Sequence, residues 1–338
     1  MRFRGWIPLV LLAALIFGVG AFTTARHRDS FLTDFNINNL LLATMPLALV
    51  AIGQTFAMLV GGFDVSVAAV VTMCVVTASF TLTDGKSGFG LFLGSLAILG
   101  VGLATGIFNA TLIRVLKLPS IIATLGTLSI LEGASLLLRD HPEGAINFDV
   151  IDALSTTRFG FMPLAFIGVV GFVVLADLWL YRTRSGMAVR SVGLDETSSR
   201  RLGMSTGIIV FGAFVVCSLM AAIAGFFEAA QVQIGSPIIG DYALTSIAAA
   251  VLGGASLAGG RGSFVGTLLA ALFLSLIDNV IPLFQQPAEY AEMTIGALIL
   301  LALLLYQAPE LIARFRSGWR AGVGRIRTTE GEAEAPAA

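Results

Sequence analysis

Apolar residues fill long stretches of this 338-residue chain, and short clusters of charged residues, proline and glycine separate those stretches. A helix needs roughly 20 mostly apolar residues to cross the hydrocarbon core of a bilayer. It also satisfies its own backbone hydrogen bonds, as lipid requires. The pattern therefore predicts an all-α integral membrane protein with about ten transmembrane helices. The apolar stretches are residues 6–25, 37–60, 65–83, 89–113, 118–138, 161–181, 207–232, 243–258, 264–284 and 290–307.

The third and eighth stretches, residues 65–83 and 243–258, are short or interrupted by glycine. We expect short, broken or re-entrant helices there. Composition supports the membrane assignment, since 57% of residues are hydrophobic, 12% are charged and the mean hydropathy is +0.92. So few polar residues could not cover the surface of a soluble globule. Cys74 and Cys217 lie inside apolar stretches, where we expect free thiols that pack as small hydrophobic groups.

The basic residues give the expected orientation. Residues 1–4 include two arginines, and the apolar run Trp6–Phe22 that follows is longer than a signal-peptide core, which favours an uncleaved first span. With a cytoplasmic N terminus and ten alternating spans, most lysines and arginines fall inside, as the positive-inside rule requires. We therefore predict a multi-pass protein of the cell inner membrane with both termini cytoplasmic. The basic residues left outside are Arg26, Arg28, Lys86, Arg139 and Arg158.

Three segments follow from this orientation. Residues 1–36 form the first transmembrane helix and the first periplasmic loop, and residues 37–308 form the membrane core, with a cytoplasmic loop at 182–206. Residues 309–338 form a cytoplasmic tail that begins basic, against anionic lipid headgroups, and ends acidic and disordered. The outside loop 139–158 is long enough to form part of a docking surface.

Two sequence patterns recur at a similar offset, which suggests an internal repeat. Gly62-Phe63-Asp64 and the apolar run after it resemble Gly240-Asp241-Tyr242 and its following run. Asn109, followed by Pro119 and Thr124-Leu125-Gly126, likewise resembles Asn279, followed by Pro287 and Thr294-Ile295-Gly296. Because the offset covers five spans, the two copies would have opposite orientations, as in inverted-repeat transporters. The alternative is chance similarity between Gly- and Ala-rich helices.

Catalytic or metal-binding chemistry is not visible in the sequence. The two histidines, His27 and His141, lie in separate outside loops, and no spacing of His, Cys, Asp and Glu indicates a metal site. Gly85-Lys86-Ser87 resembles the end of a phosphate-binding loop, but Phe80 stands where that motif needs glycine. We therefore predict that the chain is not an enzyme and itself binds no metal, cofactor or nucleic acid.

Six carboxylates lie inside the apolar stretches and are candidates for function, because a charge at membrane depth is costly. For three of them, Asp177, Glu228 and Glu292, a position near a span end makes solvation the simpler explanation. Asp64 could cap the third stretch or contact a solute. The full set is Asp64, Glu132, Asp177, Glu228, Asp278 and Glu292.

The cytoplasmic loop contains a second candidate site. Residues 187–202 have the pattern of a short amphipathic helix, in which Val189, Val192 and Leu202 alternate with charged residues. Such a helix could lie in a groove of a partner protein. The pattern is equally compatible with a helix resting on lipid headgroups.

Three segments of the chain form recognisable motifs: Gly61–Ser66, Asn109 with Leu118–Thr127, and the glycine-rich Ala248–Thr267. Together and in this order, they resemble the ribose-type sugar permeases of ABC transporters, within the branched-chain and sugar class. The resemblance extends from about Asn39 to Leu305. Departures from the common pattern are Ala68, Met187 and Ala110.

The resemblance implies a permease subunit that works with two cytoplasmic ABC ATPases, a periplasmic solute-binding protein and a second permease subunit, here expected to be an identical copy. It also favours contact of the cytoplasmic loop with the ATPase over contact with lipid headgroups. The residues of this loop that match the coupling segment of the family are Gly186, Gly193, Glu196, Arg200 and Gly203.

The function we predict is import of a small sugar or polyol by alternating access, with ATP hydrolysis on the partner chain. The alternative is an ion-coupled secondary transporter of a small polar solute that acts alone. Such a transporter should carry intramembrane carboxylates with coupling partners, and no such chain of residues is visible. Polar residues near expected helix breaks are candidates for lining or gating the path, or for capping helices: Asp64, Ser66, Asn109, Thr124, Asn279 and Thr294.

Overall fold

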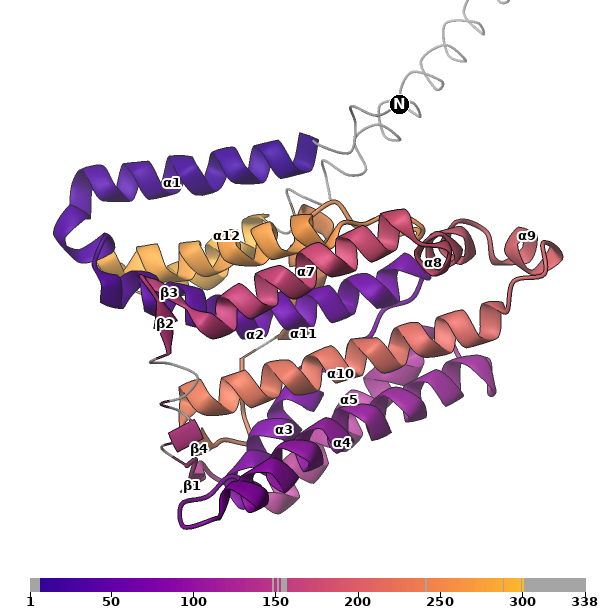
Figure 1. The fold of residues 1–338 in the computed structure, drawn as a ribbon, viewed down its shortest axis with the longest axis horizontal. Coiled ribbons are helices and arrows are strands. Elements are labelled where there is room, and N and C mark those ends of the chain that lie inside the picture. The colour runs from indigo at the N-terminus through magenta and orange to yellow at the C-terminus, as the bar shows by residue number, and fades with distance from the viewer. Residues whose placement is uncertain are drawn as a thin grey trace, which may run out of the picture. The chain divides into compact units, whose positions relative to one another are not determined.

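The computed structural model describes residues 7–300 except 148, 151, 153–156, 241, 288 and 299. Its described residues form helices joined by short loops, with two small pairs of strands (Figure 1). The helices are α1 (Ile7–Phe31), α2 (Asp34–Leu59), α3 (Val67–Thr81), α4 (Gly88–Arg114), α5 (Ser120–Leu138), α7 (Leu164–Arg182), α8 (Arg184–Leu194), α9 (Glu196–Arg201), α10 (Thr206–Val232), α11 (Tyr242–Leu252) and α12 (Phe264–Leu283). The strands are β1 (Glu143–Ala145), β2 (Arg158–Phe159), β3 (Met162–Pro163) and β4 (Ile234–Gly235).

The all-α membrane class is confirmed. Within the described residues, seven helices are long and apolar enough to cross a membrane, namely α1, α2, α4, α5, α7, α10 and α12. The third and eighth predicted stretches form the shorter helices α3, with 15 residues, and α11, with 11. At 1.5 Å per residue they extend about 22 Å and 16 Å, less than the hydrocarbon thickness. The tenth stretch is helical where it is described, and the tail 309–338 lies outside the described residues.

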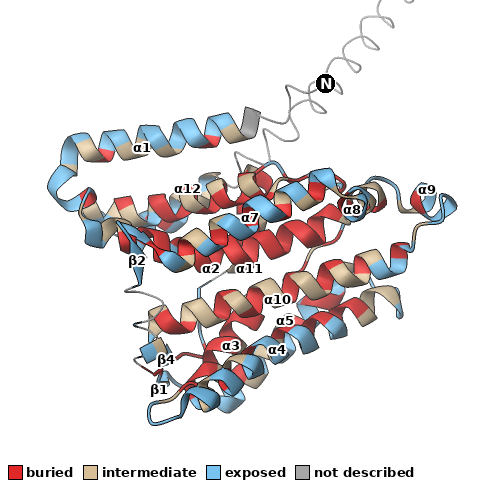
Figure 2. Cartoon of the chain, viewed as in Figure 1, coloured by how far each residue is buried: buried red, intermediate tan, exposed pale blue. Residues whose placement is uncertain are grey.

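Helix α2 forms the centre of the core. In its apolar window 94% of the residues are buried, against 11% in α1, and Figure 2 shows the same contrast. Helix α10 runs antiparallel to α2. Gln231 Nε2 donates to the carbonyl of Leu42, whereas Gly53, further along α2, faces Cys217, which lies earlier along α10. Both cysteines, Cys74 and Cys217, are buried free thiols, as the sequence predicts.

The packing around these two helices has the form of an inverted repeat. Helix α10 packs on α3 and α4, while α2 packs on α11 and α12. The first half thus contains the long helix α2, the short helix α3 and the long helix α4, and the second half contains α10, α11 and α12 in the same order of lengths. The first helix of each half packs on the second and third helices of the other half. Figure 1 shows α2 and α10 running in opposite directions. This exchange of partners is what duplication with opposite orientation produces.

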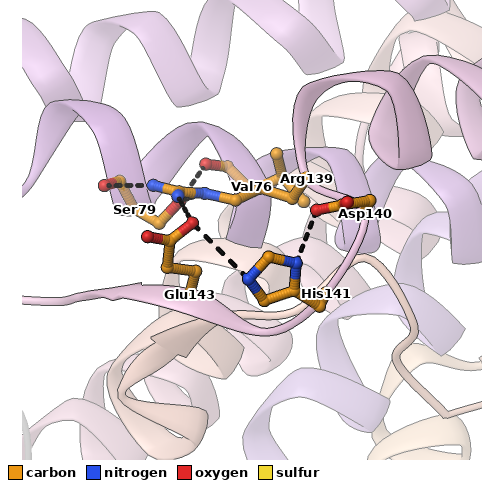
Figure 3. A network of polar contacts seen from close by, with 6 residues as sticks. All are labelled: Val76, Ser79, Arg139, Asp140, His141 and Glu143. Carbon is orange, nitrogen blue, oxygen red and sulfur yellow. Dashed lines mark hydrogen bonds and ion pairs between the residues drawn. The ribbon is translucent and has the colours of Figure 1, made fainter.

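One end of the helices is closed by the strand pairs and an arginine. Strand β1 pairs with β4, and the side chain of Arg139, just after α5, reaches back to the end of α3. Its Nε donates to Ser79 Oγ at 3.1 Å and its Nη1 pairs with Glu143 Oε2 at 3.1 Å, as Figure 3 shows. The guanidinium also lies 4.1 Å from the centre of the Phe80 ring. These contacts join α3, α5 and β1 at the end that the sequence predicts to be periplasmic.

Candidate solute path and coupling loop

The chain leaves α2 and enters α3 through a turn that packs between α5 and α10. Gly61 has a φ of +79°, a conformation that glycine adopts without strain. A Cβ at Gly62 would lie 2.7 Å from the ring of Phe214, so α10 packs directly on the turn. On its other side, Ser120 Oγ accepts from Phe63 N at 3.2 Å and Thr124 Oγ1 accepts from Val65 N at 3.2 Å. Helix α5 therefore holds the break in place.

A fully buried polar cluster follows this turn. Asp64 has no exposed surface, and its Oδ1 accepts from the amide of Ser66 at 3.0 Å and from the hydroxyl of Ser66 at 2.5 Å. Asn109 Nδ2, from α4, donates to Ser66 Oγ at 2.8 Å. The sequence alone therefore identified three residues that the fold brings into direct contact, with Thr124 bonded to the residue between Asp64 and Ser66.

Two members of the cluster were missed by the sequence analysis. Ser218 Oγ, from α10, donates to Asp64 Oδ2 at 3.3 Å. Thr127 Oγ1, from α5, donates to Asn109 Oδ1 at 2.6 Å. No local pattern distinguishes either residue, since each is one hydroxyl inside an apolar helix. The cluster of Asp64, Ser66, Asn109, Thr127 and Ser218 thus ties the break to three other helices, and we call it the Asp64 cluster.

The second repeat has a corresponding break between α11 and α12. Gly253 directly follows α11, and Gly266 lies in the first turn of α12. A Cβ added to either glycine would overlap the backbone at the other, so the end of α11 and the start of α12 are in direct backbone contact. Asp177 Oδ1, from α7, accepts from Phe264 N at 2.8 Å and from Ser263 Oγ at 3.2 Å, and so caps α12. The solvated role expected for Asp177 is therefore replaced by a capping role.

The other two candidate residues lie elsewhere. Asn279, on α12, exchanges two amide hydrogen bonds with Asn36 of α2, at 3.1 Å and 2.9 Å. Thr294 donates to the carbonyl of Tyr290 within its own helix. Neither bonds to the Asp64 cluster. Glu228, which was expected to be solvated near a span end, accepts from the hydroxyl of Tyr242 at 2.7 Å.

The cytoplasmic loop forms two helices rather than the single amphipathic helix predicted for residues 187–202. The break falls at Asp195, whose extended backbone and side chain cap α9 by accepting from Ser198 N at 3.1 Å. Val189 and Val192 are buried as predicted, but Leu202 is 78% exposed because α9 ends just before it. Gly203, with a φ of +82°, then turns the chain toward α10.

Helix α8 packs against the loops of both repeats. A Cβ at Gly193 would overlap the carbonyl oxygen of Leu59, at the end of α2, and would lie 2.6 Å from Gly260 N. Gly260 N itself donates to Leu59 O at 2.9 Å. Gly186 is equally constrained, since its Cβ would overlap the end of α7. These two glycines permit α8 to lie directly on the backbone of its neighbours.

Glu196 connects α9 to the end of α4. Its carboxylate accepts from both terminal nitrogens of Arg114, at 2.7 Å and 3.2 Å, and from Arg200 Nη2 at 2.9 Å. The hydrogen bond from Arg114 is the main cause that lowers the pKa of Glu196 to about 2. Thr206 Oγ1, at the start of α10, also donates to this carboxylate at 3.1 Å.

An open hollow lies beside this ion pair. Its volume is about 520 Å3, and side chains from the ends of α4 and α9 line it. Its lining includes both charged and apolar groups, among them Arg114, Lys117, Leu118, Glu196 and Thr197. Within the described residues, no group of three or more His, Cys, Asp or Glu side chains could hold a metal ion.

Comparison with known proteins relates this arrangement to a family of transport proteins. A family profile described as "Branched-chain amino acid transport system / permease component" matches residues 36–303. The autoinducer 2 import system permease protein LsrC of Yersinia enterocolitica is 37% identical over 267 residues, which cover 77% of this chain and 71% of that protein. The protein of the same name from Yersinia pseudotuberculosis serotype O:1b is 36% identical over 264 residues, with coverage of 77% and 73%. No solved structure matches the chain.

Proposed function

The chain belongs to the branched-chain amino acid and sugar family of ABC permeases, and on this premise we propose that it imports a small sugar or polyol by alternating access. The family provides the role of a membrane-spanning transport subunit. The ribose-type resemblance of the sequence supports a hydroxyl-rich solute, and the related permeases, which are named for autoinducer 2 import, support an import role.

The contact of α8 with both repeats is the observation that carries the mechanism. The carbonyl of Leu59 ends α2 of the first repeat, and Gly260 lies in the loop before α12 of the second. Gly193 of α8 touches both. A displacement of α8 must therefore move the ends of both repeats together, because close-packed backbones transmit displacement rather than absorb it.

The Asp64 cluster is suited to gating in this mechanism. It holds the start of α3 against α4, α5 and α10 through hydrogen bonds between buried groups. Buried polar groups favour discrete arrangements, because a partly broken network leaves unpaired donors. The break between α2 and α3 would thus shift as a unit when α8 moves.

The partners follow from the family and from the two ends of the helices. The hollow beside Glu196 and the surface of α8 and α9 would receive the ABC ATPase on the cytoplasmic side. The β1–β4 pair and the Arg139 contacts would face the periplasmic solute-binding protein. A second copy of this chain would complete the path within the inner membrane, with both termini cytoplasmic.

A test uses the chain purified in lipid with its ATPase. The solute-binding protein is first screened by thermal shift against pentoses, hexoses, polyols, autoinducer 2 and branched-chain amino acids. We expect a hydroxylated solute to stabilise it, and the loaded binding protein to stimulate ATP hydrolysis by the permease complex. Stabilisation by branched-chain amino acids alone would overturn the solute assignment. Failure of the chain to bind the ATPase would overturn the transport mechanism.

A further inference from the structure

An open groove lies between α1 and α12, on the outside of the helix bundle. Only 11% of the apolar window of α1 is buried, and α12 is its main neighbour, as Figure 1 shows. The groove has a volume of about 610 Å3, and most of its wall is hydrocarbon from side chains such as Leu15, Val19 and Ile281. Helix α1 carries no charged residue from Ile7 to Thr24. The wall therefore suits a hydrocarbon ligand rather than a polar solute.

The length of the groove matches one leaflet of a bilayer. Its lining on α1 extends from Ala14 to Thr23, which is about 14 Å at 1.5 Å per residue. Half of a hydrocarbon core is about 15 Å thick. Gly18 lies in the middle of this lining, and a Cβ added there would meet no atom within 4 Å. The groove is thus open beside Gly18, over a length that suits one acyl chain.

Aromatic rings from both helices meet at one end of the groove. The rings of Phe22 and Phe284 stack with their centres 5.8 Å apart and their planes 9° apart. His27 packs edge-on against the same Phe284 ring, with 4.5 Å between the ring centres. A further transmembrane helix, about 10 Å wide, could not lie between rings in contact, whereas a narrower acyl chain can lie beside them. This end therefore favours a chain-shaped ligand over a helix of another protein.

Polar groups gather at the same end of the groove. The guanidinium of Arg26, one turn after Phe22, lies 5.7 Å from the centre of the Phe22 ring. Gln286, just after α12, is part of the lining. Among the described residues Arg26 forms no ion pair or hydrogen bond, and the nearest acidic residue in the sequence, Asp29, comes after the departure from helical geometry at His27. One end of the groove thus presents a cation, and the remainder presents hydrocarbon.

We propose that this groove binds one molecule of an anionic diacyl phospholipid, with an acyl chain along α1 and α12 and the phosphate beside Arg26. A guanidinium matches the geometry of a phosphate and can donate two parallel hydrogen bonds to it. A basic residue at the membrane surface also attracts anionic headgroups. The order of cation, aromatic rings and hydrocarbon along the groove is the order of phosphate, ester region and acyl chain in such a lipid.

The bound lipid would attach α1 to the rest of the protein. Helix α12 is itself fixed to α2 by the two amide hydrogen bonds between Asn279 and Asn36, at 3.1 Å and 2.9 Å. A lipid in the groove adds apolar contact between α1 and this fixed helix. A ligand that binds only the folded chain stabilises it against unfolding, so this lipid should raise the thermal stability of the protein.

The test is native mass spectrometry of the full chain, purified in detergent and freed of lipid. Phosphatidylglycerol and phosphatidylcholine with the same acyl chains are titrated separately, and the affinity of the first bound molecule is measured. We expect phosphatidylglycerol to bind about fivefold more tightly, which is the effect of one basic residue near the headgroup. Arg26→Gln should abolish this preference. Arg158→Gln, which replaces another exposed arginine, should retain it.

A second pair of variants tests the acyl-chain part of the site. Gly18→Leu fills the groove and should weaken the binding of both lipids. Gly100→Leu on the exposed side of α4 is the control, because its Cβ would also meet no atom within 4 Å. Phosphatidylglycerol should raise the unfolding temperature of the unaltered chain, and glycerol 3-phosphate, which has the phosphate without acyl chains, should not.

Each part of the proposal has its own contrary result. Equal affinity for the two lipids, or an unchanged preference in Arg26→Gln, would overturn the anionic headgroup. Unchanged lipid binding in Gly18→Leu would overturn the groove as the site, and loss of chain dimers in this variant alone would assign the groove to a second copy. Equal stabilisation by glycerol 3-phosphate would overturn the acyl chain. None of these measurements requires transport, so they are separate from failure of the proposed function.

Discussion

Asp64 and Glu196 are both carboxylates with several donors, but their surroundings give them different roles. Asp64 has no exposed surface and accepts from Ser66 and Ser218. Glu196 lies at the surface and joins α9 to Arg114 through a bidentate ion pair. The first therefore contributes to the internal position of a helix break, and the second to the attachment of the cytoplasmic loop.

Removal of the Asp64 carboxylate should destabilise the protein. Asp64→Ala leaves the donors of Ser66 and Ser218 without their acceptor in a buried site, which costs about 1 to 3 kcal/mol for each unpaired group. Asp64→Asn keeps one carbonyl acceptor and should cost less. The measurement is thermal unfolding in detergent, followed by size-exclusion chromatography. Equal loss in both variants would show that the charge itself, rather than its hydrogen bonds, is needed.

Replacement of Glu196 should weaken coupling without loss of folding. At neutral pH the carboxylate is ionised, because the hydrogen bond from Arg114 holds its pKa at about 2, and its contribution is lost only as pH falls from about 4.5 toward that value. Glu196→Gln should cost about 1 kcal/mol, as expected for a partly exposed ion pair. We expect the ratio of solute imported to ATP hydrolysed to fall several-fold.

Two matched variants test this explanation. Arg200→Gln should lower the ratio of solute imported to ATP hydrolysed less than Glu196→Gln does. Glu196→Gln also removes the ion pair with Arg114, whose side chain is 20% exposed, whereas the Arg200 side chain is 69% exposed. Ser191→Ala removes a hydroxyl that bonds within α8, to the carbonyl of Met187, and should leave coupling unchanged. A normal ratio in the double variant Glu196→Gln, Arg200→Gln would contradict the assignment of this loop to coupling.

At the scale of elements, α8 lies where the two repeats meet. Gly193→Ala should displace it, since the added Cβ would overlap Leu59 O, and overpacking of this kind costs about 1 to 3 kcal/mol. We expect reduced transport, with part of the ATPase activity retained. Gly212→Ala in α10 is the control, because its Cβ would meet no atom within 4 Å. Equal transport in the two variants would show that the α8 contact is not needed.

The elements themselves were largely predictable from the sequence. Run length alone indicated α2 and α10, and glycine interruptions indicated the short helices α3 and α11. The break at Asp195 was not predicted, although Asp195 and Ser198 have the spacing of a helix cap. Apolar periodicity across 187–202 concealed it, and Leu202 was wrongly placed on the buried face as a result.

The polar contacts were only partly predictable. Asp64, Ser66 and Asn109 were found because polar residues near a helix break are conspicuous in an apolar chain. Ser218 lies 154 residues from Asp64, and its partner is decided by the antiparallel packing of α10. The hydrogen bonds between Asn279 and Asn36, which lie 243 residues apart in the sequence, likewise depend on how the helices pack. Contacts of this kind depend on tertiary packing, which a local pattern does not contain.

At the scale of the whole molecule, the two ends of the long helices carry different structural elements. One carries the strand pairs and Arg139, and the other carries α8 and α9 (Figure 1). The lysine and arginine distribution predicts that the second end is cytoplasmic. Lys86→Cys should therefore react with an impermeant maleimide on intact spheroplasts, whereas Thr197→Cys should react only after lysis. Reversed labelling would contradict the orientation.

ATP-driven uptake tests the central claim most directly. The chain is reconstituted in proteoliposomes with its ABC ATPase and the loaded solute-binding protein, and accumulation of the labelled solute is measured with and without ATP. We predict accumulation against a gradient only when ATP, the ATPase and the binding protein are all present. Accumulation by the chain alone, driven by an ion gradient in the absence of ATP, would contradict the account.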